Sequence, residues 1–266
     1  MSGTRRYRLR TAASGGIFAL AVLTFTVSGG AHSSPGFGTS RGPSSATDPY
    51  VLPVAVDWDQ SGNRQNAEAA ADGLTLNRIE DGDFDPRHPN DFWFVTTEGG
   101  KGAAVPTGSF GRDGGGLWKL SFEDVDQPWL GGTLTLVLDG SEAPFLNKPD
   151  NITIDTRGNL LIQEDPGSNV HVARIVAYDI ETGDRGVVAQ FDPALFKPVT
   201  PGGTDAPITI DEESSGIIDA KDVLGRGWYA FDAQVHKAHP DPALVELGQL
   251  LALYVRDFDD VYTISD

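Results

Sequence analysis

The chain has 266 residues, enough for one sizeable domain or two small ones, and its 38 acidic against 20 basic side chains give a formal charge of −18. This balance argues against nucleic acid or an anionic membrane surface as a partner, because both attract a positively charged protein surface. With no cysteine and only five histidines, the chain has no disulfide, thiolate metal site or cysteine nucleophile, and oxygen ligands favour hard cations such as Ca2+, Mg2+, Mn2+ or ferric iron.

Residues 1–31 are typical of an export signal that is cleaved after Ala31. Four arginines form its positive end, and the apolar stretch 17–27 that follows is too short to span a bilayer comfortably. The string TRRYRL loosely matches a twin-arginine signal, although Arg8 stands where that motif has an apolar residue. The alternative is a retained membrane anchor. We expect a protein that is secreted or held at the exterior of the cell envelope, without membrane contact after signal removal.

Residues 32–75 are expected to form a disordered linker and a short leading strand. The first part, 32–48, is rich in Ser, Gly and Pro, a composition that does not support a packed core. The string YVLPVAVDW (50–58) predicts one strand. The string SGNRQNAEAA (61–70) predicts a loop or a single helical turn.

A weak internal repeat occupies residues 76–256 and is the most informative feature of the sequence. Each copy reads as an acidic residue, a short strand, a tight turn and further strands, and 32 glycines and 17 prolines suit so many turns. The copies begin with RIEDGDFDPRHPNDFWFVTTEGG (78–100), KPDNITIDTRGNLLIQEDPG (148–167) and EESSGIIDAKDVLGRGWYAFDAQ (212–234). Units of about 60 residues with up to four strands match propeller blades, so we expect an all-β protein, a β-propeller with about three four-stranded blades.

Further strands and two short helical turns are predicted within and after these copies. The strands are GLWKLSF (116–122), GTLTLVL (132–138), ARIVAYDI (173–180), GVVAQFD (186–192) and GQLLALYV (248–255). The helical turns are DPALFK (192–197) and DPALVELG (241–248), each with Asp before Pro as a start signal. Residues 257–266 remain as an acidic tail.

Acidic residues stand at the same place in each copy, just before its first strand: Glu80, Asp150 and Glu213. In a propeller the first strand of every blade runs along the central channel, so equivalent positions converge on one axis. Like charges that meet there repel one another unless a cation neutralises them. The pattern therefore predicts a cation site, and the alternative is that each carboxylate simply caps a strand end in solvent.

The strings RIEDGDFDPRHPNDFWFVTT, NKPDNITIDTRGNLLIQEDPG, DEESSGIIDAKDVLGRGWYAFDAQVH and GQLLALYV, in this order, resemble the bacterial PhoX-type alkaline phosphatases over roughly residues 76 to 255. The resemblance implies an exported, metal-dependent hydrolase of phosphate monoesters. It also implies a six-bladed propeller with calcium (Ca2+) and ferric iron (Fe3+) at the mouth of its channel.

Residue roles carry over from this resemblance by motif. The string RIE implies Arg78 for the phosphate oxygens and Glu80 for a metal, and PDN implies Asp150 and Asn151 as ligands or ligand orienters. Three further candidates for the metal site are Glu213, Glu164 and His236. We accordingly expect Arg78, Glu80 and Asn151 to act in catalysis, and Glu80, Asp150, Glu213 and Glu164 to bind metal.

The chain also departs from the family pattern. Family members are longer and carry an additional half before the RIE region, they supply an iron-binding cysteine, and they have RPE where this chain has RIE. Three blades cannot close a ring, so the repeat corresponds to the C-terminal half of the family propeller. We expect either an internally deleted relative or one that is completed by a second copy of itself or by a complementary half-propeller.

Two other functions fit the same pattern of residues. One is a propeller lactonase with a single divalent ion held by Glu, Asn and Asp, against which Arg78 argues because its guanidinium suits a phosphate dianion. The other is a non-catalytic module that binds calcium. The string DGDFD (81–85) predicts an acidic turn and GRDGGG (111–116) a flexible loop, and the serines of ESSG do not stand in a hydrolase elbow.

Overall fold

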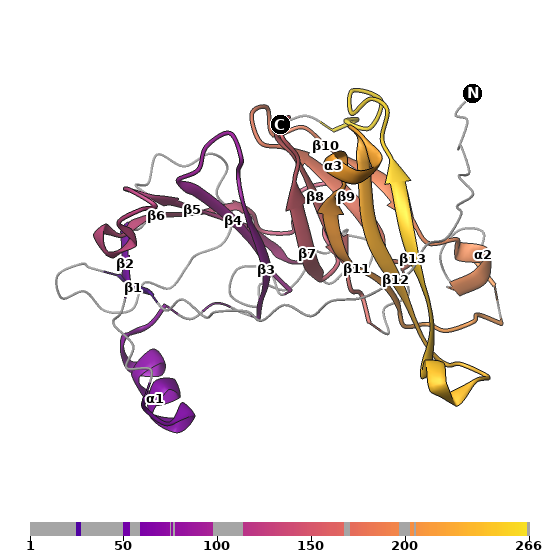
Figure 1. The fold of residues 1–266 in the computed structure, drawn as a ribbon, viewed down its shortest axis with the longest axis horizontal. Helices are drawn as coiled ribbons and strands as arrows, with labels where there is room; N and C mark the ends of the chain where they lie inside the picture. Colours follow the sequence, from indigo (N-terminus) through magenta and orange to yellow (C-terminus); the bar gives the residue numbers. More distant parts are fainter. Residues whose placement is uncertain are drawn as a thin grey trace. The chain divides into compact units, whose positions relative to one another are not determined.

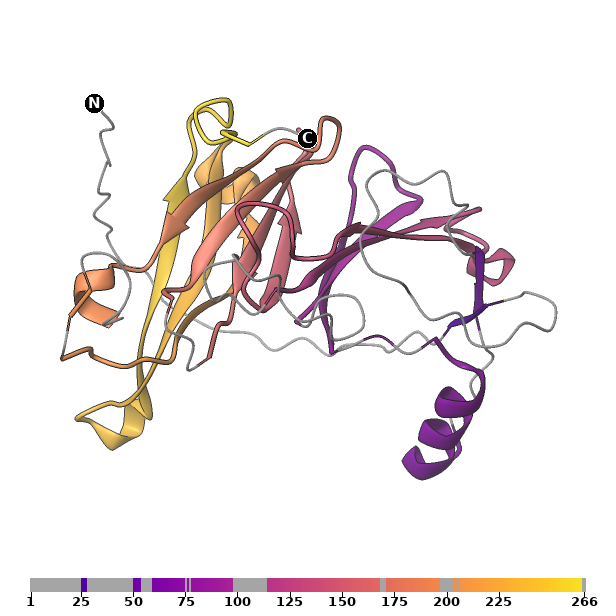
Figure 2. The same ribbon diagram turned by 180° about the vertical axis from the view of Figure 1, so that it is seen from behind.

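The computed structural model is mostly β, with antiparallel sheets, and divides into two compact units (Figures 1 and 2). The N-terminal unit comprises residues 20–150 and 155–158, and the C-terminal unit holds residues 151–154 and 159–264. The described residues are 25–27, 50–53, 59–74, 76, 78–97, 114–167, 171–196, 203–204 and 206–264. None of the helices among them is long and apolar enough to cross a membrane.

The N-terminal unit is built on one sheet with the strand order β1-β2-β6-β5-β4-β3. Four of its strands form a continuous antiparallel meander: β3 (Ile79–Phe84), β4 (Asp91–Thr96), β5 (Gly116–Phe122) and β6 (Gly132–Leu138). Two short strands, β2 (Tyr50–Pro53) and β1 (Phe25–Val27), extend the sheet beyond β6, and the 3-10 turn η1 (Pro128–Leu130) precedes β6. The four-stranded part matches the first predicted copy, and β5 and β6 have the predicted boundaries.

Aromatic side chains on one face of this sheet form the core of the N-terminal unit. Phe94 of β4 lies next to Trp118 of β5, with nearly parallel rings whose centroids are 6.2 Å apart. Leu120, Phe122 and Leu134 complete the buried cluster, against which Leu74 and Leu76 also pack. The alternation of apolar side chains along β4 and β5 produces this packing, because residues two apart lie on the same face of a strand.

The segment between the leading strand and β3 differs from the expectation. Residues Gly62–Asp72 form an α-helix, α1, where a loop or a single turn was predicted. Its start is encoded locally, because the Ser61 hydroxyl accepts a hydrogen bond from the backbone N–H of Arg64 and so caps the helix. Four alanines in NAEAAAD favour continuation. Of the leading strand predicted over residues 50–58, the structure describes β2 (Tyr50–Pro53), and residues 54–58 lie outside the described residues.

The C-terminal unit contains two further antiparallel sheets. The four-stranded sheet has the order β10-β9-β8-β7, from β7 (Pro149–Ile154), β8 (Asn159–Glu164), β9 (Arg174–Asp179) and β10 (Arg185–Gln190). The three-stranded sheet has the order β11-β12-β13, from β11 (Glu212–Asp219), β12 (Trp228–Ala238) and β13 (Glu246–Tyr254). The short elements are α2 (Pro193–Phe196), α3 (Lys221–Leu224) and η2 (Pro242–Leu244). The third sheet therefore has three strands where four were expected of a blade.

These two sheets pack face to face, as both ribbon views show (Figures 1 and 2). Tyr229 and Phe231 of β12 lie in one buried cluster with Leu161 of β8 and Ile175 of β9. Side-chain amides join the sheets as well, since Gln163 Oε1 accepts a hydrogen bond from the backbone N–H of Ile217 at 2.9 Å. The apolar face of each sheet is thus buried against the other.

The opposite face of the three-stranded sheet is exposed and partly apolar. Side chains alternate along β12, so Tyr229 and Phe231 point inward while their neighbours point outward. Ile218, Leu250 and Tyr254 lie on the outer face with 59%, 54% and 40% of their surface exposed. A cluster of large apolar side chains on the surface of one face is a common mark of an interaction surface.

The turns that follow β3, β7 and β11 have the same construction. Asp85, Asp155 and Asp219 each accept, through Oδ1, the backbone N–H of the residue two positions later, at 2.8, 2.8 and 3.0 Å. That later residue is basic in every case: Arg87, Arg157 and Lys221, and its side chain pairs with the same aspartate. The pairing of an aspartate with a basic residue two positions later is thus common to the first hairpin of all three copies of the repeat.

The first two of these turns also contact each other within the N-terminal unit. Arg87 Nη1 donates a hydrogen bond to the backbone oxygen of Arg157 at 2.9 Å. The guanidinium of Arg87 lies so close to Gly158 that a Cβ there would be 1.9 Å from Nη2, and Gly158 has φ of +91°. The positive φ favours glycine at this position, and a Cβ would also displace the end of the Arg87 side chain.

The ends of the chain are only partly described. The expected signal (1–31) lies outside the described residues except for β1, and the linker 32–48 lies outside them entirely. In the acidic tail, Phe258 is 5% exposed and packs in the core, and Ile264 exchanges backbone hydrogen bonds with Arg185. Residues 257–264 are thus part of the C-terminal unit.

Candidate functional site

The sequence motif RIE forms a small polar cluster at the beginning of β3. Arg78 Nη2 lies 3.3 Å from Glu80 Oε1, and the same oxygen accepts a 2.6 Å hydrogen bond from the hydroxyl of Thr97. Thr97 is 2% exposed, and its backbone N–H donates to the backbone oxygen of Arg78. Arg78 and Glu80, both predicted from the motif, therefore lie together, and Thr97 fixes the orientation of the carboxylate.

Backbone geometry directs the side chains of this cluster. Arg78 has φ of +57°, a conformation that is uncommon for a residue with a side chain. The register between β3 and β4 shifts between Ile79 and Gly82, so Glu80 lies within a β-bulge. Bulges redirect side chains and are frequent beside functional sites. The side chain of Arg78 is 59% exposed and that of Glu80 is 26% exposed, so both side chains are accessible to a solute.

The PDN motif lies at the start of β7, the first strand of the second sheet. Asn151 Oδ1 accepts hydrogen bonds from the hydroxyl of Ser215 at 2.7 Å and from the backbone N–H of Gly216 at 3.1 Å. These partners lie in β11, which is the first strand of the third sheet and has its own bulge between Ser215 and Ile218. The side chain of Asn151 thus connects the first strands of two successive sheets, and the neighbouring Asp150 is half-buried on β7.

Asp232 lies opposite Ser215 in the β11–β12 ladder. Burial raises the pKa of its carboxyl above the ordinary value, because desolvation disfavours the charged form. A Cβ on Gly216, which has φ of +62°, would be 3.1 Å from Asp232 Oδ1, so this glycine allows a close approach. Neither Ser215 nor Asp232 was predicted as part of the site.

Glu213 and His236 form a second polar group on the three-stranded sheet. His236 Nε2 lies 3.6 Å from Glu213 Oε1, and His236 Nδ1 lies 3.0 Å from Glu246 Oε2. The imidazole therefore connects β11 to β13 across β12. Glu213 is largely shielded, with 12% of its side chain exposed, whereas Glu246 is 48% exposed.

Glu164 is fully buried at the end of β8 and is bound by Arg174 of β9. Its two carboxylate oxygens accept hydrogen bonds from Arg174 Nη2 at 2.5 Å and Nε at 2.9 Å. The backbone N–H of Arg174 donates to the same carboxylate at 3.1 Å. This fork geometry neutralises the charge of Glu164 within the protein.

The predicted residues thus form separate groups. Arg78 lies with Glu80, Asn151 with Ser215, Glu213 with His236, and Glu164 with Arg174. Glu80 and Asp150 belong to the N-terminal unit and Glu213 to the C-terminal unit. Within the described residues, no three His, Asp or Glu side chains gather as a ready metal site. The convergence of the three carboxylates on one cation stays a prediction.

Sequence reasoning missed several partners for one shared reason. Thr97 and Glu246 are brought to the site only by pairing of strands: Thr97 follows β4, and Glu246 begins β13. A signal for Thr97 was present, because a hairpin places the residue after the second strand beside the start of the first. Glu246 could not be found in this way, since His236 reaches it across an irregular part of the β12–β13 ladder.

The chain matches no protein-family model and no curated protein sequence.

Proposed function

We propose that the protein is an exported, metal-dependent phosphatase that hydrolyses phosphate monoesters and resembles the PhoX-type enzymes. The observation that carries this proposal is the group Arg78–Glu80–Thr97. An exposed guanidinium presents donors in a fork that matches phosphate oxygens. Glu80 keeps Arg78 in place, and Thr97 keeps Glu80 in place, so the fork is partly pre-oriented for an anion.

The metal of this proposal is a hard cation held by the carboxylates predicted from the sequence. The candidate ligands Glu80, Asp150 and Glu213 offer carboxylate oxygens only, which suit Ca2+, and ferric iron is the second metal that the family resemblance implies. A bound cation would polarise the phosphate and stabilise the charge that develops during transfer. Arg78 would bind non-bridging oxygens, and Asn151 would orient a ligand or the substrate through its amide.

We further propose that the sheets are blades of a propeller that represents half of a ring. Three features support this arrangement. Consecutive strands lie side by side within β3–β6, within β7–β10 and within β11–β13, the first strand of each of these sets is at a sheet edge, and the same Asp–basic turn follows it. The hydrogen bonds from Ser215 and Gly216 to Asn151 join two such first strands. In a propeller, first strands adjoin one another around the channel.

The partner that completes the ring is proposed to be a second copy of the chain. The outer face of the three-stranded sheet carries Ile218, Leu250 and Tyr254, which are the kind of side chains that a following blade would cover. An isolated chain would leave this face in water, and pairing in a closed arrangement would remove it from solvent. The alternative partner is a different protein, a complementary half-propeller, that would cover the same face.

Hydrolysis of p-nitrophenyl phosphate by the mature protein tests the proposed activity. We expect turnover with calcium, with or without ferric iron, and loss of turnover when a chelator is added. Arg78→Ala should lower kcat/KM by about 100-fold, which is the effect of removing one pre-oriented donor from a charged transition state. The matched control is Arg226→Ala, an exposed arginine in the β11–β12 connection, which should leave turnover unchanged.

Three outcomes would contradict the proposal. Equal activity of the Arg78 and Arg226 variants would remove Arg78 from the site. Cleavage of a lactone without cleavage of the phosphate ester would identify a propeller lactonase. If calcium raises the melting temperature while no ester is cleaved at any metal composition, the protein is a non-catalytic calcium-binding module.

A further inference from the structure

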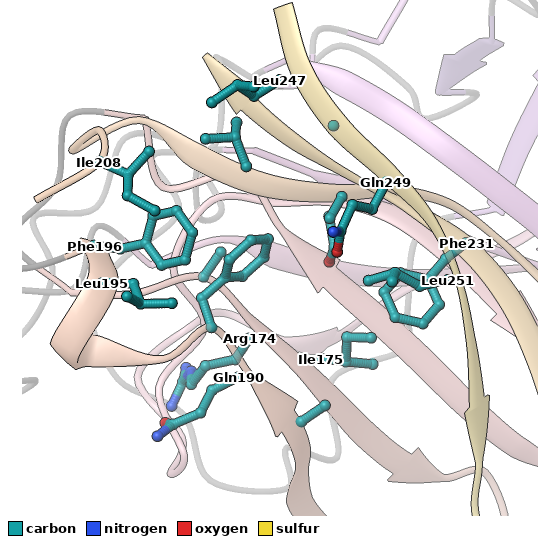
Figure 3. A pocket seen from close by; sticks show the side chains of 17 residues that line it. Arg174, Ile175, Gln190, Leu195, Phe196, Ile208, Phe231, Leu247, Gln249 and Leu251 are labelled. Atoms are coloured by element: carbon teal, nitrogen blue, oxygen red, sulfur yellow. The ribbon is translucent and has the colours of Figure 1, made fainter. Parts of the chain in front are cut away.

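A cavity of about 450 Å3 lies within the C-terminal unit, between the four-stranded and three-stranded sheets. Its walls come from β9 and β10 on one side and from β11, β12 and β13 on the other, with α2 and Ile208 at one end. Figure 3 shows Leu195, Phe196 and Ile208 grouped on one side of the space, and Phe231 and Leu251 on the other. Its size is within the range of pockets that bind small molecules.

The aromatic end of the cavity is held in place by the chain itself. Asp192 Oδ1 accepts the backbone N–H of Ala194 at 3.0 Å and so begins α2. This turn directs Phe196, which is 7% exposed, edge-on to Phe191 with ring centroids 5.1 Å apart. The backbone N–H of Ile208 donates to the oxygen of Leu195 at 2.8 Å. The wall is therefore held by contacts within the chain.

One polar group in the wall has no partner among the described residues. Ser214 of β11 lines the cavity, is 2% exposed, and its hydroxyl makes no hydrogen bond within the described part of the chain. An unpaired buried hydroxyl is unfavourable, because it has lost its hydrogen bonds to water without gaining others. A ligand with a hydroxyl, amine or carbonyl group would pair with it.

The charge of the cavity excludes an anionic ligand as the preferred occupant. Arg174 is the charged residue among those that line it, and its guanidinium is bound by the buried carboxylate of Glu164 through two hydrogen bonds. Separating this pair to bind an external anion would leave a buried charge without compensation. The remaining polar lining, Gln190 and Gln249, is uncharged.

We propose that this cavity is a binding site for a neutral, mainly apolar small molecule with a single hydrogen-bonding group, which pairs with the hydroxyl of Ser214. The site shares no residue with the group Arg78–Glu80–Thr97. Its ligand is recognised by aromatic and aliphatic contact, with Ser214 as the orienting group.

Two fluorescent probes with almost the same rings test the proposal. The neutral probe is N-phenylnaphthylamine, which has one N–H group, and the anionic probe is anilinonaphthalene sulfonate, which adds a sulfonate. We expect one saturable site per chain for the neutral probe and affinity for the anionic probe that is lower by about tenfold or more. Absence of saturable binding of the neutral probe, or equal affinity of the two probes, would overturn the proposal.

Variants locate the site. Ser214→Ala should weaken binding of the neutral probe by about fivefold, the value of one hydrogen bond, whereas Ser141→Ala, an exposed serine in the N-terminal unit, should have no effect. Ala233→Leu fills the cavity and should weaken binding by about tenfold or more. If that variant does not fold, Gln249→Trp on the more exposed wall replaces it. Unchanged binding in the filled variant would place the probe elsewhere and contradict the proposal.

Discussion

Asp85 illustrates how a single buried carboxylate holds a turn. It is fully buried, its Oδ1 accepts the backbone N–H of Arg87, and its Oδ2 lies 2.8 Å from His88 Nδ1. Burial alone would raise the pKa of Asp85, but the hydrogen bonds from His88 and Arg87 and their charges outweigh it, so the pKa is lower than usual. The ionised form of the Asp85 carboxyl is thus more stable in the folded protein than in the unfolded chain.

A pH-dependent contribution to stability follows from this lowered pKa. The stabilisation from ionised Asp85 is present at pH values above the pKa of the unfolded chain, about 3.9, and is lost as the pH falls through the lower folded value. Asp85→Asn should reduce the free energy of unfolding by about 1 to 3 kcal/mol at neutral pH, and by less in acid. Urea unfolding across this pH range measures the difference.

The control for this experiment is Asp126→Asn, at an exposed position after β5. It should change the free energy of unfolding little at any pH. If Asp85→Asn loses the same free energy in acid as at neutral pH, the ionised carboxylate is not what stabilises the turn.

Among the candidate site residues, Glu164 could not be interpreted from the sequence alone. The string QED indicates polar residues after a strand, which suits a ligand at a loop end. In the structure Glu164 is the last residue of β8 and fully buried, and its charge is balanced by Arg174, ten positions later. Only the pairing of β8 with β9 brings the two together, and strand register was not available from the residues.

At the scale of elements, the strands were predictable and the helix was not. The predicted strands coincide with β5 and β6 and lie within one or two residues of β9, β10 and β13 at their starts. Alternating apolar residues and turn-forming Gly, Pro and Asn determine these elements locally. The polar helix α1 lacks a strong apolar face, so periodicity did not reveal it although its Ser61 cap was visible.

The common turn was only partly visible in the sequence. The strings DPRHPND, DTRGN and DAKDVLGRG have different lengths, which hides the shared Asp-x-Arg or Asp-x-Lys core. The structure shows the same hydrogen bond in all three. When the three copies are aligned on these aspartates, Glu80 and Asp150 each stand five residues before the aspartate. In the third copy that position is Ser214, and Glu213 stands one residue before it.

That offset in the third copy is accompanied by a difference in its strand. The bulge of β11 lies between Ser215 and Ile218, one to four residues before its aspartate, whereas that of β3 lies farther from the turn. A bulge changes which side of the strand a residue faces. The side of the strand to which a carboxylate points is thus set jointly by its position in the sequence and by the bulge, and the spacing of the acids alone does not determine it.

At the scale of the whole molecule, the exposed face of the three-stranded sheet predicts self-association. The mature chain should sediment with twice the mass of one chain, because Ile218, Leu250 and Tyr254 would be buried in the contact. Leu250→Lys should shift the protein to single chains. Val223→Lys, on the exposed helix α3 with 86% of Val223 in solvent, is the matched control and should not.

Sedimentation equilibrium gives the mass in each case. A mass of one chain for the unaltered protein would contradict self-association, and recovery of a stoichiometric second protein with a complementary set of sheets would identify a half-propeller partner instead. A dimer that persists in Leu250→Lys at the same affinity would place the contact on another surface.

Calorimetric titration of calcium into the mature protein tests most directly whether carboxylates from successive sheets hold one cation. The account predicts a single saturable site that Glu80→Gln abolishes and that Glu181→Gln, an exposed acid in the β9–β10 connection, leaves intact. Loss of one of several converging carboxylates removes both charge and a ligand from the cation. Identical titrations of the two variants, or no saturable binding by the unaltered protein, would contradict the account.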